Sequence, residues 1–151
     1  MTEVWWALCV AWAASAAALD ETPPQAPQPG EQVWPARIVE LHWMHSIERV
    51  QWIEAYALPQ PDAQFSALQP LRARVVGSGA GMEPAPQALW RHGGYEWTPP
   101  QPVPQLLLAH SAYTADYALC LDGRCTPLAE RLPAQASAHG GVVRLRPCRT
   151  D

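Results

Sequence analysis

The sequence contains neither lysine nor asparagine, and it has a single phenylalanine. All ten basic residues are arginines, scattered among fourteen acidic residues, so the formal net charge is −4. A chain without a basic stretch offers no surface that could hold a phosphate backbone, which argues strongly against a nucleic-acid partner. Several enzyme motifs are missing too: there is no G-x-S-x-G nucleophile elbow, P-loop, dinucleotide-binding fingerprint or C-x-x-C-H haem-attachment motif.

Proline and tryptophan are abundant instead, with 17 and 8 copies in 151 residues. Proline disfavours long helices, while tryptophan supplies a large apolar area for a small core. A chain of this length is expected to form one domain.

Short apolar runs separated by turn residues fill the chain from Ala36 onward. We therefore predict an all-β domain over residues 36–149, a single small β-sandwich or open barrel of about eight antiparallel strands. A short helix is expected at Ala129–Ala138, interrupted by Pro133. The expected strands are Arg37–His45, Val50–Leu58, Ser66–Val76, Leu89–Trp97, Gln105–His110, Tyr113–Leu121, Arg124–Leu128 and Val142–Arg146.

The first 35 residues have the pattern of a targeting segment followed by a linker. Val4–Leu19 is uncharged and mostly apolar, is shorter than the roughly 20 residues of a membrane span, and ends in small residues typical of a signal-peptidase site. We predict that residues 1–18 form a cleaved signal peptide; an uncleaved N-terminal anchor and a buried helix are the alternatives. Residues 19–35 carry five prolines and no apolar period, which predicts an extended linker. The expected location is periplasmic or exported, with or without a membrane tether.

The segment C-L-D-G-R-C predicts a disulfide. Asp122 and Gly123 suit a two-residue hairpin turn, which places Cys120 directly opposite Cys125 and within reach of a disulfide bond. The alternative is a pair of buried thiols in a reduced protein. Cleavage after residue 18 would remove Cys9 and leave Cys148 buried or free.

The densest chemistry lies in HSIERVQWIEAY, from His45 to Tyr56. Alternate residues of a strand share a face, so an antiparallel hairpin whose paired residue numbers add to an odd sum puts His45 and Glu54 on one apolar side. A buried carboxylate must be neutral, hydrogen-bonded or paired. Glu54 is therefore a structural partner of His45 or of an arginine such as Arg37, a polar spot that binds a ligand, or half of an acid–base pair.

A pair of histidines and a glycine-rich segment are two further candidate sites. His42 and His45 have the H-x-x-H spacing that converges on a helix but diverges on a strand, so we expect no metal site. The segment GSGAGME has glycine at positions 77, 79 and 81. Three interpretations are open for this segment: a tight structural turn, a backbone site that binds a carboxylate, or a close-packed contact to the hairpin. RHGGYEW predicts a further hairpin turn, with Trp90 and Trp97 packing inward.

Taken in order, HSIERVQWIEAY, GSGAGME, RHGGYEW and LCLDGRC resemble a bacterial family called domain of unknown function 1850, and the resemblance covers Trp34 to Arg146. The positions that match the family pattern best are His45, Ser46, Glu48, Trp52, Glu54, Tyr56, Gly77, Gly79, Ala80 and Gly81. The resemblance implies a small exported or membrane-tethered accessory protein without an established activity. Genes of this family often lie beside tripartite periplasmic (TRAP) transporters whose solute receptors belong to the TAXI class.

We therefore expect an exported accessory module that binds a TRAP permease, a TAXI-type solute receptor, a small carboxylate, or a combination of these, and that needs no cofactor. The expected binding residues are His45, Ser46, Glu48, Trp52, Glu54, Tyr56, Gly77, Ser78, Gly79, Ala80 and Gly81. The alternatives are a periplasmic enzyme that uses Glu54 and His45 as an acid–base pair, and a purely structural partner of a permease.

Overall fold

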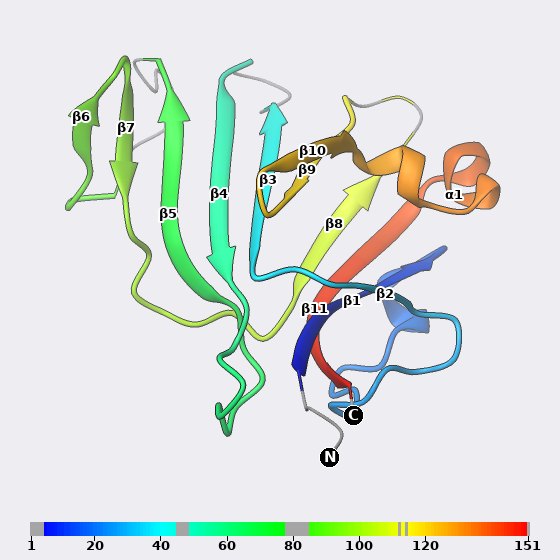
Figure 1. Cartoon of the computed structure of the whole chain (residues 1–151). Coiled ribbons are helices and arrows are strands. Elements are labelled where there is room, and N and C mark those ends of the chain that lie inside the picture. Colours follow the sequence, from blue (N-terminus) through cyan, green and yellow to red (C-terminus); the bar gives the residue numbers. More distant parts are fainter. Residues whose placement is uncertain (1–4, 45–48, 78–84, 112, 114, 151) are drawn as a thin grey trace.

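The computed structural model describes residues 5–44, 49–77, 85–111, 113 and 115–150. These residues form two antiparallel sheets that pack face to face over part of their area (Figure 1). The prediction of an all-β fold is confirmed, and the arrangement is sandwich-like because the described strands form no closed barrel.

The small sheet has four strands, and its two longest strands lie at its centre. The spatial order is β2 (Gln32–Trp34), β1 (Trp5–Ala13), β11 (Gly141–Thr150) and β8 (Leu106–His110). β1 pairs with β11 along its entire length, from Trp5 opposite Thr150 to Ala13 opposite Val142. The first and last strands of the chain are thus neighbours.

The large sheet has seven strands and carries most of the segments that the sequence analysis singled out. Its order is β10 (Arg124–Pro127), β9 (Ala118–Leu121), β3 (Ile38–Met44), β4 (Gln51–Ala57), β5 (Gln69–Val76), β7 (Gly94–Trp97) and β6 (Leu89–Arg91). The expected strand Leu89–Trp97 is divided into β6 and β7 by a turn in which His92 and Gly93 both have positive φ. Glycine tolerates this conformation at little cost.

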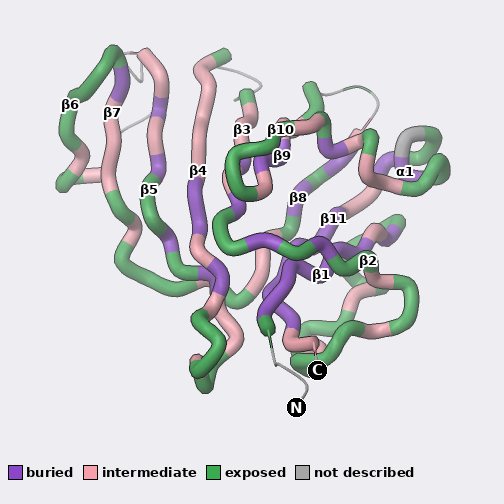
Figure 2. Tube along the Cα trace, viewed as in Figure 1, coloured by how far each residue is buried: buried purple, intermediate pink, exposed green. Residues whose placement is uncertain are grey.

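The core fills the space between the small sheet and only one half of the large sheet. Its buried side chains come from the small sheet, β3, the end of β4, β9 and the adjoining loops, and include Leu8, Val143, Leu41 and Leu119. Figure 2 shows that β6 is exposed and that β7 is mostly half-buried. One half of the large sheet therefore has no second sheet packed against it.

The segment that was expected to be a signal, an anchor or a buried helix is strand β1 in this structure, with Ala7, Leu8 and Cys9 fully buried. Only the short 3-10 helix η1 (Ala16–Ala18) follows it. None of the helices in the described part of the chain is long and apolar enough to cross a membrane. The all-β domain therefore begins well before residue 36.

The proline-rich segment 19–35, expected to be a tether, lies against the outer face of the small sheet. Arg146 donates hydrogen bonds to the carbonyl oxygens of Pro24 and Ala26 and to both oxygens of Glu31, and Arg144 donates one to the carbonyl of Asp20. The side chains of Arg144, Arg146 and Glu31 are only 2%, 3% and 2% exposed. The end of this segment is strand β2, while residues 19–31 belong to no strand, and proline suits them because their backbone N–H groups are not needed for a sheet.

Both cysteine pairs are oxidised. Cys120 and Cys125 form the predicted disulfide, with Cα atoms 3.9 Å apart and with Asp122 and Gly123 in the expected positive-φ turn. Cys148, expected to be buried or free once cleavage removes Cys9, is buried and bonds in this structure to Cys9, 139 residues away, and no described cysteine is free. Two disulfides are typical of a protein that folds in an oxidising environment.

The helical expectation near the C-terminus is met in two pieces. The 3-10 helix η2 (Leu128–Arg131) and the helix α1 (Ala134–His139) are separated at Pro133, which precedes the first residue of α1. Proline cannot donate the backbone hydrogen bond that a continuous helix would need there.

Candidate binding site on the aromatic face of the large sheet

The register of the β3–β4 hairpin places the apolar stripes of both strands on one face. Leu41 pairs with Glu54 and Trp43 pairs with Trp52, which confirms the predicted odd sum. Directly opposed residues of antiparallel strands share a face, so Glu54 lies on the same side as the core residues Leu41 and Tyr56. Glu54 therefore sits where the covered half of the sheet meets the uncovered half.

The carboxylate of Glu54 is held by two aromatic donors. The indole Nε1 of Trp43 donates to Oε2 at 2.9 Å, and the hydroxyl of Tyr56 donates to Oε1 at 3.2 Å. These bonds fix the orientation of the carboxylate, and the other described residues leave some of its lone pairs without a donor. The suggestion that Arg37 pairs with Glu54 is wrong for the described contacts, since the backbone N–H of Arg37 bonds to Asp122 at the far end of β3.

Two tyrosines titrate abnormally around this carboxylate. Burial, the negative charge of Glu54 and the hydrogen bond to it all raise the pKa of Tyr56. Burial and the charge of Glu54 also raise the pKa of Tyr117. Both hydroxyls therefore stay protonated near neutral pH, and Tyr56 acts as a donor to Glu54 and not as a base.

Indole rings extend the site across the uncovered half of the sheet. Trp43 and Trp52 stack with ring centroids 5.4 Å apart, and Trp97 contacts Trp52 edge-on at 5.8 Å. At the sheet edge, Trp90 contacts Tyr95 edge-on at 5.1 Å. The cross-strand pairs Trp43–Trp52, Trp52–Val75, Val75–Tyr95 and Tyr95–Trp90 run in one row on this face. We call this row, together with Glu54 and Trp97, the aromatic face.

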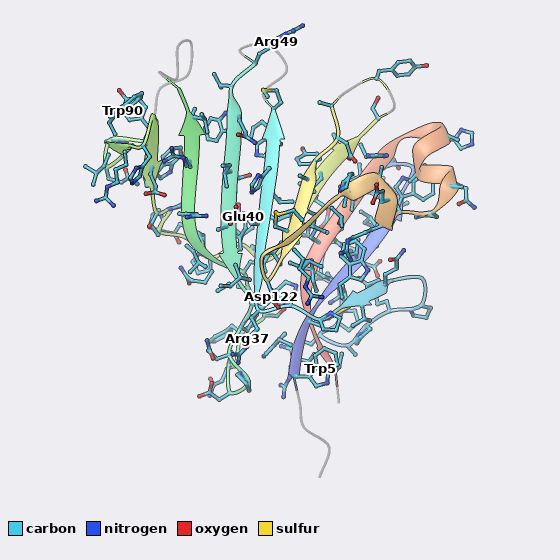
Figure 3. The ribbon with its side chains drawn as sticks, turned by 45° about the horizontal axis from the view of Figure 1, so that its top comes forward. Trp5, Arg37, Glu40, Arg49, Trp90 and Asp122 are labelled. Atoms are coloured by element: carbon cyan, nitrogen blue, oxygen red, sulfur yellow. A yellow bond between two sulfur atoms is a disulfide. The ribbon has the colours of Figure 1, made fainter. Side chains whose placement is uncertain are left out.

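The expectation that Trp90 packs inward is wrong, because its side chain is 55% exposed. Figure 3 shows Trp90 on the outermost strand of the large sheet. The row of aromatic residues continues beyond the core, and its last ring is more than half exposed. Trp97, one strand closer to the core, is half-buried.

The aromatic face also contains a buried donor with no acceptor. The indole Nε1 of Trp52 is inaccessible to solvent and has no hydrogen-bond partner among the described residues. Buried polar groups are normally satisfied, so each exception asks for an explanation. This unpaired indole N–H belongs to the residue next to Glu54 on the same face of β4.

The structure brings together only part of the expected site. Trp52, Glu54 and Tyr56 lie on one face, whereas His45, Ser46, Glu48, Ser78, Gly79, Ala80 and Gly81 lie outside the described residues. Gly77 is described: its φ is +95°, and its N–H donates to the carbonyl of Gly93 at 2.7 Å. This bond ties Gly77, the first residue of the glycine-rich segment, to the β6–β7 hairpin.

Sequence reasoning missed the contributions of Tyr117 and Trp97 to this site. Tyr117 immediately precedes β9, whose place beside β3 depends on a long-range pairing. Trp97 reaches Trp52 because β7 pairs with β5, and β5 with β4. The useful signal was the alternation of Tyr95 and Trp97 along one face of a strand.

The opposite face of the large sheet is polar. His42 contacts Glu40 with a distance of 2.5 Å between Nε2 and Oε1, and Arg72 donates to the other oxygen of Glu40 at 3.1 Å. Cys120 Sγ lies 3.8 Å from the same nitrogen of His42. Within the described ranges no three His, Cys, Asp or Glu side chains are grouped so that they could hold a metal ion.

These features define a small, disulfide-bonded, all-β protein with one aromatic and one polar face on its larger sheet. The chain belongs to a family described as "Domain of unknown function (DUF1850)", whose profile matches residues 39–128. The matched region extends from β3 to the beginning of η2 and contains the aromatic face. Neither the curated proteins nor the solved structures contain a significant match.

Proposed function

We propose that this protein is an exported accessory module that binds a protein of a TAXI-type TRAP uptake system, either the permease or the solute receptor, through its aromatic face. The observation that carries the binding proposal is the oriented carboxylate of Glu54 beside a row of partly exposed indole rings. Tryptophan and tyrosine dominate the energetically important positions of protein interfaces. The proposed transporter rests on membership in the family and on the neighbouring genes that the family resemblance implies.

The geometry favours a macromolecular partner over a small carboxylate. The described donors around Glu54 are already directed at Glu54 itself, and a second carboxylate would meet its negative charge. A partner that supplies a donor to Glu54 would add a hydrogen bond to a carboxylate that Trp43 and Tyr56 already orient. Trp90, which is 55% exposed at the edge of this face, would add apolar contact area.

The compartment is proposed on the chemistry of the cysteines. Both disulfides persist only where thiols are not continuously reduced, as in the bacterial periplasm. A periplasmic location would also give the protein access to a solute receptor and to the outer surface of a permease.

The test is a pull-down from detergent-solubilised membranes of cells that co-express the neighbouring permease and receptor, with the full chain as bait. We expect Trp90→Ala and Glu54→Gln to lower the recovery of the partner about tenfold or more. Leu107→Ala is the matched control, because Leu107 is an exposed apolar residue of similar accessibility on β8, in the other sheet.

The site variants must also be shown to fold. Melting temperatures near that of the wild type would do so, and a spectroscopic titration should show the tyrosine pKa values falling in Glu54→Gln because a charge that raises them is gone. If the wild type recovers neither partner, or if both folded variants recover it as well as the wild type does, the proposal is wrong.

A further inference from the structure

The two disulfides of this protein lie in very different surroundings. Cys9 and Cys148 are both fully buried and join strands from the two ends of the chain. Cys120 and Cys125 close a loop of only five residues' separation in a hairpin at the edge of the large sheet. A loop this short removes little entropy from the unfolded chain, so the second bond adds much less stability than the first.

The accessibility of Cys120 and Cys125 is unequal. Cys125 is exposed on the edge strand β10, whereas Cys120, on β9, is only 4% exposed. A thiolate arriving from solvent can therefore approach the sulfur of Cys125, and Cys120 would be the sulfur that leaves.

The leaving sulfur faces a histidine that is itself held in place. His42 Nε2 lies 3.8 Å from Cys120 Sγ and 2.5 Å from Glu40 Oε1, so a proton on Nε2 is held between a carboxylate and the sulfur. Glu40 pairs directly with Cys120 in the β3–β9 register, and Arg72 from β5 balances its charge. Figure 3 shows Glu40 on β3 in the middle of the large sheet. The other strand that pairs with β3 is β4, and it places the uncharged Ile53 opposite His42.

We propose that Cys120–Cys125 is a thiol–disulfide exchange site, distinct from the aromatic face, that reacts with a dithiol reductant such as the active site of a thiol oxidoreductase. One reductant thiolate forms a bond to Cys125 Sγ, the Cys120–Cys125 bond breaks, and its electron pair passes to Cys120 Sγ. The Nε2–H of His42 donates a hydrogen bond to the thiolate that forms on Cys120, and this thiolate takes its proton from solvent. The second thiol of the reductant then attacks the mixed disulfide, which releases Cys125 as a thiol and the reductant as its own disulfide.

Reduction would leave the fold in place. The hairpin turn is anchored independently of the disulfide, because Asp122 Oδ1 accepts hydrogen bonds from the backbone N–H groups of Arg37 and Ile38, and the Asp122 N–H bonds to the Ile38 carbonyl. Figure 3 shows Arg37 and Asp122 close together at this end of the sheet. The bond that opens would free only the four-residue edge strand β10.

The test uses the full oxidised chain and dithiothreitol as the dithiol, with timed alkylation and mass spectrometry to locate each thiol. We expect Cys120–Cys125 to open at least about tenfold faster than Cys9–Cys148 under native conditions. His42→Leu should slow the opening about tenfold, because a hydrogen bond to a developing thiolate is lost. His139→Leu, on α1, is the matched control and should react like the wild type.

A monothiol shows which of the two sulfurs is attacked, independently of the rate. Glutathione should form its mixed disulfide on Cys125 and leave the free thiol on Cys120. The proposal is overturned if the adduct forms on Cys120, if the two disulfides open together only when the protein unfolds, or if His42→Leu reacts at the wild-type rate.

Discussion

The most costly charges to bury in this protein are those of Arg144, Arg146 and Glu31. Arg146 shares both oxygens of Glu31, while Arg144 reaches the same carboxylate at 3.4 Å. Two buried cations around one carboxylate are tolerated because backbone carbonyls of Asp20, Pro24 and Ala26 accept further hydrogen bonds from them, although Arg144 Nε has no partner among the described residues. The hydrogen bonds of the two buried arginines therefore depend on the proline-rich segment keeping its position against the sheet.

This cluster predicts a loss of stability in acid. Burial alone would raise the pKa of Glu31, but hydrogen bonds from Arg146 and the Gln28 backbone, with the charges of both arginines, hold it below its ordinary 4.5. A lowered carboxyl pKa stabilises the fold fully above that ordinary value, and the contribution disappears as the pH falls through the lower folded-state value. We expect the free energy of unfolding, measured in urea, to fall below pH 4.5.

Glu31→Gln should reproduce the acid effect at neutral pH, because it leaves both arginines without their counter-charge. Breaking one side of a buried ion pair costs on the order of 3–5 kcal/mol. The variant should therefore have a lower free energy of unfolding at pH 7 and a flatter pH profile in acid than the wild type. Equal stability of variant and wild type at pH 7 would show that the cluster contributes nothing.

Among the strands, β1 is the one on which we expect the stability of the fold to depend most. It lies between β2 and β11, contributes buried residues to both faces of the small sheet, and is bonded to β11 through Cys9 and Cys148. The Cys9–Cys148 bond alone would contribute about 5 kcal/mol by the chain-entropy estimate. A chain that lacks β1 would expose the core on one side and leave Cys148 without a partner.

We therefore expect removal of residues 1–18 to abolish cooperative thermal unfolding, and we expect the folded protein isolated from cells to retain residues 5–13. Intact mass and thiol counting on the denatured, unreduced protein check this directly: the retained chain has no free thiol, whereas a chain starting at residue 19 has one. A folded protein that starts near Leu19 would refute this expectation and support the interpretation of residues 1–18 as a cleaved signal.

The conformation of β1 was hard to predict for a physical reason. A central strand buried on both faces shows no alternation of apolar and polar residues, so its sequence has the same pattern as a signal-peptide core or a buried helix. Cleavage after residue 18 would remove Cys9, so the prediction excluded Cys9 from any disulfide, although four cysteines suggest two pairs. By contrast, β3 and β4 each have one apolar face and one polar face, and there the period of two fixed the register in advance.

The candidate site was predictable to the same extent. Glu54 among Trp52 and Tyr56 follows from alternation along one strand, and the pairing with Trp43 follows from the hairpin. Alternation along β3 is also enough to put Glu40 and His42 on the other face. Their contact with Cys120 depends on β9 returning beside β3 after more than seventy residues, and no local pattern encodes that pairing.

For the whole molecule, the decisive asymmetry is that a four-stranded sheet covers only part of a seven-stranded one. The uncovered half leaves the aromatic face accessible, while the polar face of the same sheet carries the His42 and Cys120 contacts. Side chains that point to opposite faces of one sheet do not touch, even when they are neighbours in sequence. Trp43 and His42 are adjacent in the chain and serve different faces.

This separation predicts that partner binding and thiol exchange are independent. Glu54→Gln should lower partner recovery without changing the rate at which dithiothreitol opens Cys120–Cys125, and His42→Leu should do the reverse. The double variant should show both losses with no coupling beyond about 0.5 kcal/mol, the usual limit for sites that share no partner. A larger coupling in this double-mutant cycle would mean that β3 transmits a change from one face to the other, so that the redox state of the hairpin would control binding.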